Sequence, residues 1–289
     1  MKKRTIDEDV RMRDVLAAID LQQLNHFFGS LAERSGVRYL PLSKEHFFLA
    51  DEDQQEYAVH NIESGDILFN PISLSKLFDQ SDDPTVRELI IVYFLTHEAS
   101  HAAGKNGAEE KYFLGVARSR STSGYRRQDM IKLPFIQTYL RDHDTFMLFN
   151  EAVIEKIARQ SRQEYEAARG FKRASVDTAN SILENNVRGA ESYNDLIQLL
   201  DRLTTAIAEK NGISEHIAWE AILAGAYQGE DLGEKKISKW LNDTTAVEDF
   251  HHRLAELPYN RDLIHRLSDD LVAQVRKPPV ELSRKPFYR

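Results

Sequence analysis

The sequence predicts an α+β fold that is predominantly α-helical, with a small N-terminal sheet, antiparallel or mixed, and a helical C-terminal part. Apolar residues recur at helical spacing over most of the chain from residue 72 onward. Short segments rich in β-forming residues lie instead between residues 37 and 70. The 289 residues include only 13 glycines and 8 prolines, which favours helices over a fold dominated by turns.

The N-terminal region begins with a predicted helix over residues 9–35, which Gly36 ends. The predicted strands that follow are residues 37–40, 46–49, 57–60 and 66–69. Asn70 and Pro71 end the last strand, because proline cannot donate a hydrogen bond to a neighbouring strand. These segments together predict the small sheet.

Two long helices are expected after the sheet. The first covers residues 84–104, with Asp83 as its N-cap and Gly104 as its C-cap. The second begins after Asp144, its expected N-cap, and continues to a break near Gly170. Further helices are expected at residues 191–211, 214–228, 245–255 and 260–275, and residues 277–289 are expected to form an extended, proline-containing tail.

Composition narrows the classes of function. The chain has 38 basic and 46 acidic residues, a formal net charge of −8, and no cysteine. The absence of cysteine excludes disulfides, a thiol nucleophile and cysteine-bound metal, so a metal site must use His, Asp or Glu. The acidic balance and the lack of a recognisable module argue against nucleic acid as a partner. The N-terminus shows no signal peptide and the longest apolar run, residues 89–95, is too short for a membrane span, so we expect a cytoplasmic protein with no membrane partner.

The most informative motif is His97-Glu98-Ala99-Ser100-His101, an H-E-x-x-H pattern inside the apolar helix expected over residues 84–104. Residues four apart lie on one face of a helix, so both imidazoles can reach one metal ion. Glu98 lies about 100° around the helix, where it can accept a proton from a metal-activated water. The alternative is a chance match, in which two core histidines hydrogen-bond to backbone or carboxylate groups.

A third ligand is expected from Asn150-Glu151-Ala152-Val153-Ile154-Glu155, which also has a helical pattern. Glu151 and Glu155 are four residues apart and stand among apolar residues, where two like charges are costly unless a cation compensates them. A dication held by Glu151 and the two histidines would supply that compensation, and Glu155 would accept a hydrogen bond from a ligand histidine. The alternative places both acids on a solvated face with basic neighbours as partners.

The two motifs together resemble the gluzincin branch of zinc metallopeptidases, which includes thermolysin and carries H-E-x-x-H on one helix and an N-E-x-x-S/T-D/E-like signature on the next. Here the second motif is N-E-A-V-I-E, and Ile154 stands where a small hydroxyl residue is usual. The resemblance covers residues 56–160 and extends to uncharacterised bacterial proteins with an N-E-A-I-T-E signature. It implies a zincin-like fold, Zn²⁺ as cofactor, His97, His101 and Glu151 as its ligands, Glu98 as general base and Glu155 behind the ligands.

The resulting prediction is a zinc-dependent peptidase that hydrolyses a peptide or protein substrate with a metal-activated water. Residues 1–170 would form its catalytic part, residues 171–276 a helical C-terminal part, and residues 277–289 the tail. One alternative is an inactive or latent zincin-like protein that binds peptides or proteins, and another is an unrelated helical interaction protein. In zincin folds an edge strand aligns the substrate, and residues 66–70 resemble that strand, with a core strand as the alternative.

Other residues have weaker grounds for a role. A peptidase benefits from a donor that faces the developing oxyanion, and the candidates are Tyr125, His143, Tyr193, His216 and Tyr227. His46 and His60 are expected to be half-buried strand residues. The basic segment 118–127 is expected to be a flexible loop, which would act as a lid, bind an acidic substrate group, or simply be solvated.

Overall fold

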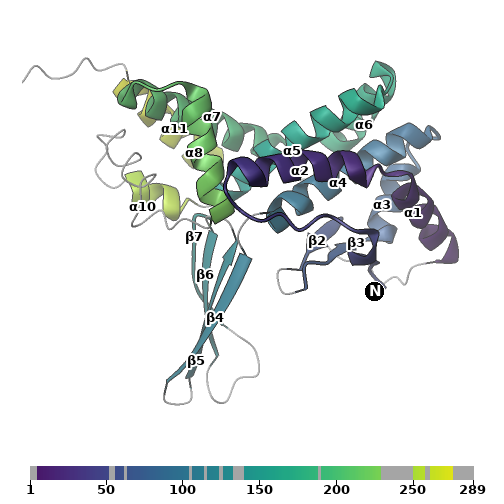
Figure 1. Cartoon of the computed structure of the whole chain (residues 1–289), viewed down its shortest axis with the longest axis horizontal. Helices are drawn as coiled ribbons and strands as arrows, with labels where there is room; N and C mark the ends of the chain where they lie inside the picture. The colour runs from purple at the N-terminus through teal and green to yellow at the C-terminus, as the bar shows by residue number, and fades with distance from the viewer. Residues whose placement is uncertain are drawn as a thin grey trace, which may run out of the picture.

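The computed structural model describes residues 5–51, 56–61, 64–103, 106–113, 116–123, 126–132, 140–187, 190–228, 250–257 and 261–275. Within these ranges the chain is mostly helical, with a small three-stranded mixed sheet and a second sheet of four strands. Helices make up the body of the molecule, and the four-stranded sheet extends away from it (Figure 1). The predicted α+β class with a predominance of helix is confirmed.

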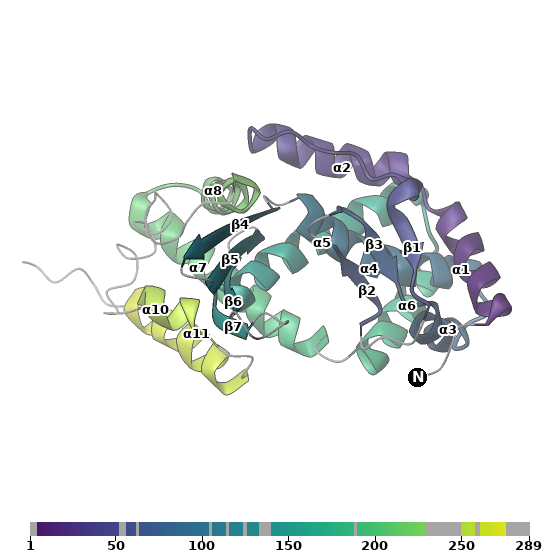
Figure 2. The same ribbon diagram turned by 90° about the horizontal axis from the view of Figure 1, so that it is seen from below.

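The N-terminal region forms two helices, α1 (Ile6–Ala18) and α2 (Leu21–Arg34), which follow one another along one side of the molecule (Figure 2). The prediction of a single helix over residues 9–35 is therefore wrong. The chain breaks there because the Asp20 carboxylate accepts hydrogen bonds from two backbone N–H groups in the first turn of α2 and so starts a new helix. Gly36, with a φ of 68°, follows the end of α2 as predicted.

The small sheet consists of β1 (Phe47–Leu49), β2 (Ala58–His60) and β3 (Ile67–Phe69), and the short 3-10 helix η1 (Lys44–His46) precedes it. The strand order is β1-β3-β2, with β1 parallel and β2 antiparallel to β3. The sheet is therefore mixed, which is one of the two forms that the sequence predicts.

One expectation for this region is wrong, and one alternative that the sequence leaves open is decided. Residues 37–40 form an irregular connection and not a strand, and the Tyr39 hydroxyl donates a hydrogen bond of 2.7 Å to Asn25 Oδ1, which ties the connection to α2. For residues 66–70 the sequence leaves an edge strand and a core strand open, and β3 is the central strand of the sheet, which agrees with the second alternative. Pairing order depends on contacts that are distant in sequence, so composition did not distinguish β3 from β2, which lies at the edge.

A buried helix, α4 (Pro84–Ala103), follows the shorter helix α3 (Pro71–Phe78) and carries the H-E-x-x-H motif. Asp83 caps α4 as predicted, because its Oδ1 atom accepts a hydrogen bond of 2.9 Å from the backbone N–H of Thr85. The expected C-cap, Gly104, lies outside the described residues. On one side α4 packs against α1, α3 and β2, so the edge strand of the small sheet lies beside the motif.

After α4 the chain forms a sheet that the sequence did not predict. Its strands are β4 (Asn106–Phe113), β5 (Val116–Ser123), β6 (Arg126–Lys132) and β7 (Leu140–Thr145), each antiparallel to the next. The expectation of a flexible loop at residues 118–127 is therefore wrong, since β5 and β6 take up all of this segment except residues 124 and 125, which lie outside the described ranges. Hydrogen bonds between antiparallel backbones do not require apolar side chains, and these polar strands show little of the apolar alternation that would have indicated them.

The helix α5 (Met147–Arg169) begins directly after this sheet. Asp144 is not its N-cap as expected but lies in β7, and the N-cap is Phe146, which has a φ of 57° and makes no side-chain capping bond. The backbone N–H of Phe146 instead donates to the carbonyl of Ala255 over 2.9 Å, so a tertiary contact fixes the start of the helix. Gly170, with a φ of 61°, ends α5 where the sequence predicted a break.

The remaining helices are α6 (Arg173–Asn186), α7 (Ala190–Asn211), α8 (Glu215–Gln228), α10 (Phe250–Ala255) and α11 (Arg261–Val275). The predicted helices at residues 191–211, 214–228 and 260–275 are confirmed to within one residue at each start. Of the helix expected at residues 245–255, only residues 250–255 are described, and the tail lies outside the described ranges. None of the described helices combines the length and hydrophobicity needed to span a membrane.

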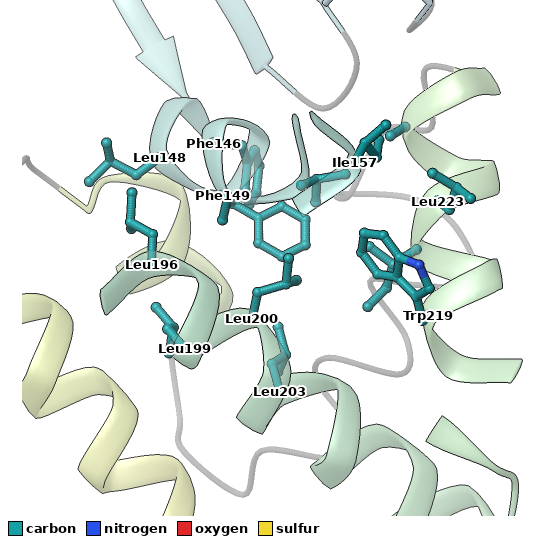
Figure 3. Packing of buried hydrophobic residues seen from close by; sticks show 14 of the residues in the cluster. Phe146, Leu148, Phe149, Ile157, Leu196, Leu199, Leu200, Leu203, Trp219 and Leu223 are labelled. Atoms are coloured by element: carbon teal, nitrogen blue, oxygen red, sulfur yellow. The ribbon is translucent and has the colours of Figure 1, made fainter. Parts of the chain in front are cut away.

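Two buried clusters hold α4 and α5 in place. In one, Phe149 of α5 points toward Leu200 of α7, and Trp219 of α8 covers a neighbouring part of the cluster (Figure 3). The other packs the apolar faces of α4 against α1, α3 and α6, and Tyr165 near the end of α5 belongs to it. Because α4 and α5 also contact each other, side chains on their facing surfaces are held at fixed relative positions.

Candidate metal centre

The two histidines of the H-E-x-x-H motif lie one turn apart on the face of α4 that meets α5. Their ring centroids are 5.0 Å apart, and both side chains are mostly buried, with 15 and 17% exposed for His97 and His101. The i, i+4 spacing on a regular helix produces this arrangement directly. Both imidazoles therefore face the same space between the two helices.

Glu151 of α5 completes a group of three. Its carboxylate oxygens lie 3.6 Å from the Nε2 atom of His97 and 3.6 Å from the Nε2 atom of His101. One ligand atom from each of the three side chains lies within 4.8 Å of the other two, so the group could hold a metal ion. The distances fit this interpretation, because a tetrahedral shell with bonds of about 2.0–2.1 Å separates its ligand atoms by about 3.3 Å.

Glu155 lies behind this group, one turn farther along α5. Only 1% of its side chain is exposed, its Oε2 atom lies 3.1 Å from His97 Nδ1, and its Oε1 atom accepts a hydrogen bond of 2.9 Å from Arg159 Nε. Burial opposes ionisation of this carboxyl, yet the hydrogen bonds from His97 and Arg159 hold its pKa below the ordinary value. The contact at Nδ1 leaves His97 Nε2 directed at Glu151.

The charges of the group depend on one another. Burial would raise the pKa of Glu151, but His101 and His97 hold it well below its ordinary value. Burial would likewise lower the pKa of His97, but Glu151 and Glu155 raise it well above its ordinary value. At both groups burial opposes the charged form, and the contacts between the imidazoles and Glu151 decide the direction of the shift.

Glu98 stands beside the three side chains and is held by the small sheet. Its Oε2 atom accepts a hydrogen bond of 2.8 Å from the backbone N–H of His60 in the edge strand β2. Burial raises the pKa of Glu98 above its ordinary value, in spite of the neighbouring histidines. A carboxylate with a raised pKa next to a cation site can both accept and release a proton.

The two histidines, Glu98 and Glu151 open into one cavity of about 340 Å³. Its described lining consists of Glu56, Ala58, Val59 and His60 from the region of β2, His97, Glu98 and His101 from α4, Glu151 from α5, Arg126 and Gln128 from β6, and Tyr193 from α7. Burial, with a smaller contribution from His101, lowers the pKa of His60 to about 4, so this imidazole is neutral at pH 7. The cavity is thus bounded by the edge strand on one side and by a strand of the unpredicted sheet on another.

The five candidate oxyanion donors lie in different places. Tyr193 lines the cavity, and its ring centroid is 5.7 Å from that of His97. Tyr227 is buried and lines a separate cavity of about 650 Å³, which α4 borders with alanines rather than with the histidines. His216 is exposed near the start of α8, in a depression shared with α2 and α5. Tyr125 and the side chain of His143 lie outside the described part of the structure.

The sequence missed three contributors to this cavity. The β2 backbone at His60 holds Glu98, although the sequence indicated only a strand residue there. Arg126 and Gln128 reach the cavity from β6. The basic residues of segment 118–127 were noticed in the sequence. Because β5 and β6 were not predicted, nothing related these residues to the histidines.

No family model, curated protein sequence or solved structure matches this chain. The interpretation of the site therefore depends on its own geometry and chemistry.

Proposed function

We propose that this chain is a zinc-dependent peptidase with a gluzincin-like site, in which His97, His101 and Glu151 hold the ion. The observation that supports it is the convergence of two imidazoles from one helix and a buried carboxylate from the next, beside a fourth side chain, the acid Glu98. Two histidines and one glutamate leave a coordination position open, which is typical of catalytic rather than structural zinc. Other divalent ions accept the same donors, so zinc itself is part of the proposal.

Each residue around the ion would have its own role in hydrolysis. A zinc ion bound there would polarise the scissile carbonyl and lower the pKa of a water molecule. Glu98, fixed by the His60 amide, takes a proton from the attacking water and passes it to the nitrogen of the leaving amine. Tyr193 supplies a hydroxyl donor for the charge that develops on the carbonyl oxygen.

The edge strand β2 supports a peptide as substrate. It forms one border of the small sheet, packs against α4, and lines the cavity through residues 58–60. A peptide that adds to such an edge in extended form gains backbone hydrogen bonds with little dependence on its side chains. A peptide laid along β2 would pass Glu98 and the three candidate ligands.

The test compares wild type, Glu98→Gln and Glu166→Gln in metal content and in hydrolysis of a peptide library. Glu166 is a matched control, since it lies on α5 in an ion pair with Arg162 at 3.5 Å and does not line the cavity. We expect about one zinc per chain in all three proteins, with hydrolysis in wild type and Glu166→Gln and a loss of at least about 100-fold in Glu98→Gln. Equal hydrolysis by wild type and Glu98→Gln would overturn the assigned mechanism, and a chain that takes up no metal would overturn the proposal as a whole.

A further inference from the structure

The strand β6 brings two polar side chains to the candidate metal cavity. Arg126 and Gln128 both line it, as expected for residues two apart on a strand, whose side chains share a face. Both are partly buried. They approach from the four-stranded sheet, whereas the candidate ligands come from α4 and α5 and the backbone donor to Glu98 comes from β2.

The charge of Arg126 stands out within this cavity. The described lining contains three acids, Glu56, Glu98 and Glu151, and Arg126 carries the one fixed positive charge outside the histidine pair. Partners for the two inner acids are provided by other residues, because Glu98 accepts the His60 amide and Glu151 faces the two imidazoles. Arg126 therefore adds a positive charge to the wall of the same cavity, which a substrate bound beside the candidate ligands would meet.

We propose that Arg126, assisted by the carboxamide of Gln128, binds a carboxylate of the substrate, so that the site selects acidic peptides. This inference rests on the proposed peptidase function. A guanidinium presents N–H donors in a planar fork that matches the two oxygens of a carboxylate, and glutamine adds a neutral donor to the same group. The carboxylate can come from an Asp or Glu side chain or from the C-terminus of the peptide. A cavity of about 340 Å³ takes a short stretch of peptide, so either source would lie near the scissile bond.

The experiment measures binding of fluorescent peptides to zinc-loaded Glu98→Gln protein, in which slow hydrolysis does not interfere. Four peptides share one apolar core and combine Glu or Gln at one position with a free or an amidated C-terminus. The same background then carries Arg126→Gln, Arg126→Lys or Arg253→Gln. Arg253 is a matched control, since it forms an exposed ion pair with Asp270 on the C-terminal helices. Zinc content and thermal unfolding are measured for each protein, so that a damaged metal site or fold is recognised.

We expect Arg126→Gln to weaken binding at least about tenfold for the peptides that carry the recognised carboxylate, and to leave the Gln, amidated peptide unchanged. Arg126→Lys retains part of the preference because it keeps the charge but not the fork, and Arg253→Gln has no effect. Dependence on the Glu side chain or on the free C-terminus identifies the source of the carboxylate, and either result supports the inference.

Two results would overturn the inference, and they differ from one another. If Arg126→Gln weakens binding of all four peptides equally, or of none of them, while zinc is still bound, the arginine does not recognise a carboxylate. The peptidase proposal is then unaffected. If no peptide binds to the zinc-loaded protein with intact Arg126, the proposed function fails together with the inference.

Discussion

The substitution Glu155→Gln gives the sharpest test of how the candidate metal centre is built. Glu155 is almost completely buried and serves two donors at once, with His97 Nδ1 at 3.1 Å and Arg159 Nε at 2.9 Å. Glutamine has nearly the same shape, but it offers one carbonyl oxygen and one NH2 group. Either His97 Nδ1 or Arg159 Nε would then face the NH2 group, which cannot accept a hydrogen bond. If this happens at His97, its ring loses the partner that orients it.

The expected magnitude follows from these contacts. Removal of the partner that orients a ligand histidine typically weakens metal binding 10- to 100-fold. That range corresponds to about 1.4–2.8 kcal/mol of binding free energy. The lower end applies if the glutamine oxygen turns toward His97 and leaves Arg159, which is partly exposed, to find water.

The assay is competition for the metal between the protein and a chelator of known affinity, with Zn²⁺ and with Co²⁺, whose visible absorption also reports the geometry of the ligands. Glu166→Gln is again the control, because it makes the same chemical change on the same helix in a pair that does not reach the histidines. Equal affinity of Glu155→Gln and wild type, or an equal loss in both variants, would refute the assigned role of Glu155.

Three further predictions concern the frame of the site and its protons. Gly170→Ala should lower the free energy of unfolding by about 1–2 kcal/mol in urea titrations, since φ is 61° there and open space around the position leaves backbone strain as the cost. Asp83→Ala should cost about 1 kcal/mol at pH 7. A hydrogen bond from Ser175, with further bonds from Thr85, holds the Asp83 pKa below 3.8, so this difference should be full above that pH and shrink as the pH falls through the lowered pKa. Metal affinity should rise as the pH increases above the ordinary imidazole value of 6.5, because the pKa of His97 is raised and the metal must displace its proton; chelator titrations that show no pH dependence would contradict this.

The parts of the fold that sequence reasoning predicted depend on local patterns. The helix α4 was recognisable because Asp83 and Pro84 mark its start and an apolar stripe continues to the histidines. The helices α7, α8 and α11 follow from amphipathic periodicity in the same way. The approach of α5 to the histidines was predicted from Glu151 and Glu155, because two like charges among apolar residues are costly unless a cation compensates them. That signal is also contained in a short segment of sequence.

The parts that were missed depend on contacts between distant segments. The strands β4 to β7 have little apolar alternation, so their existence is decided by backbone pairing with the next strand and not by a sequence period. The central place of β3 and the edge place of β2 are likewise set by pairing order. The start of α5 at Phe146 depends on a hydrogen bond to Ala255, more than 100 residues away, which no local capping rule contains.

This difference explains why the candidate metal ligands could be predicted from the sequence, whereas the residues that reach the cavity from β6 could not. Glu151, Glu155 and Arg159 follow one another at four-residue intervals, so one face of α5 places the third candidate ligand, the acid behind it and the cation that holds that acid. Arg126 reaches the same cavity from a strand whose position is set by its neighbours in the sheet. Helical spacing therefore places the candidate metal ligands, whereas the fold as a whole places Arg126, which we propose selects among substrates.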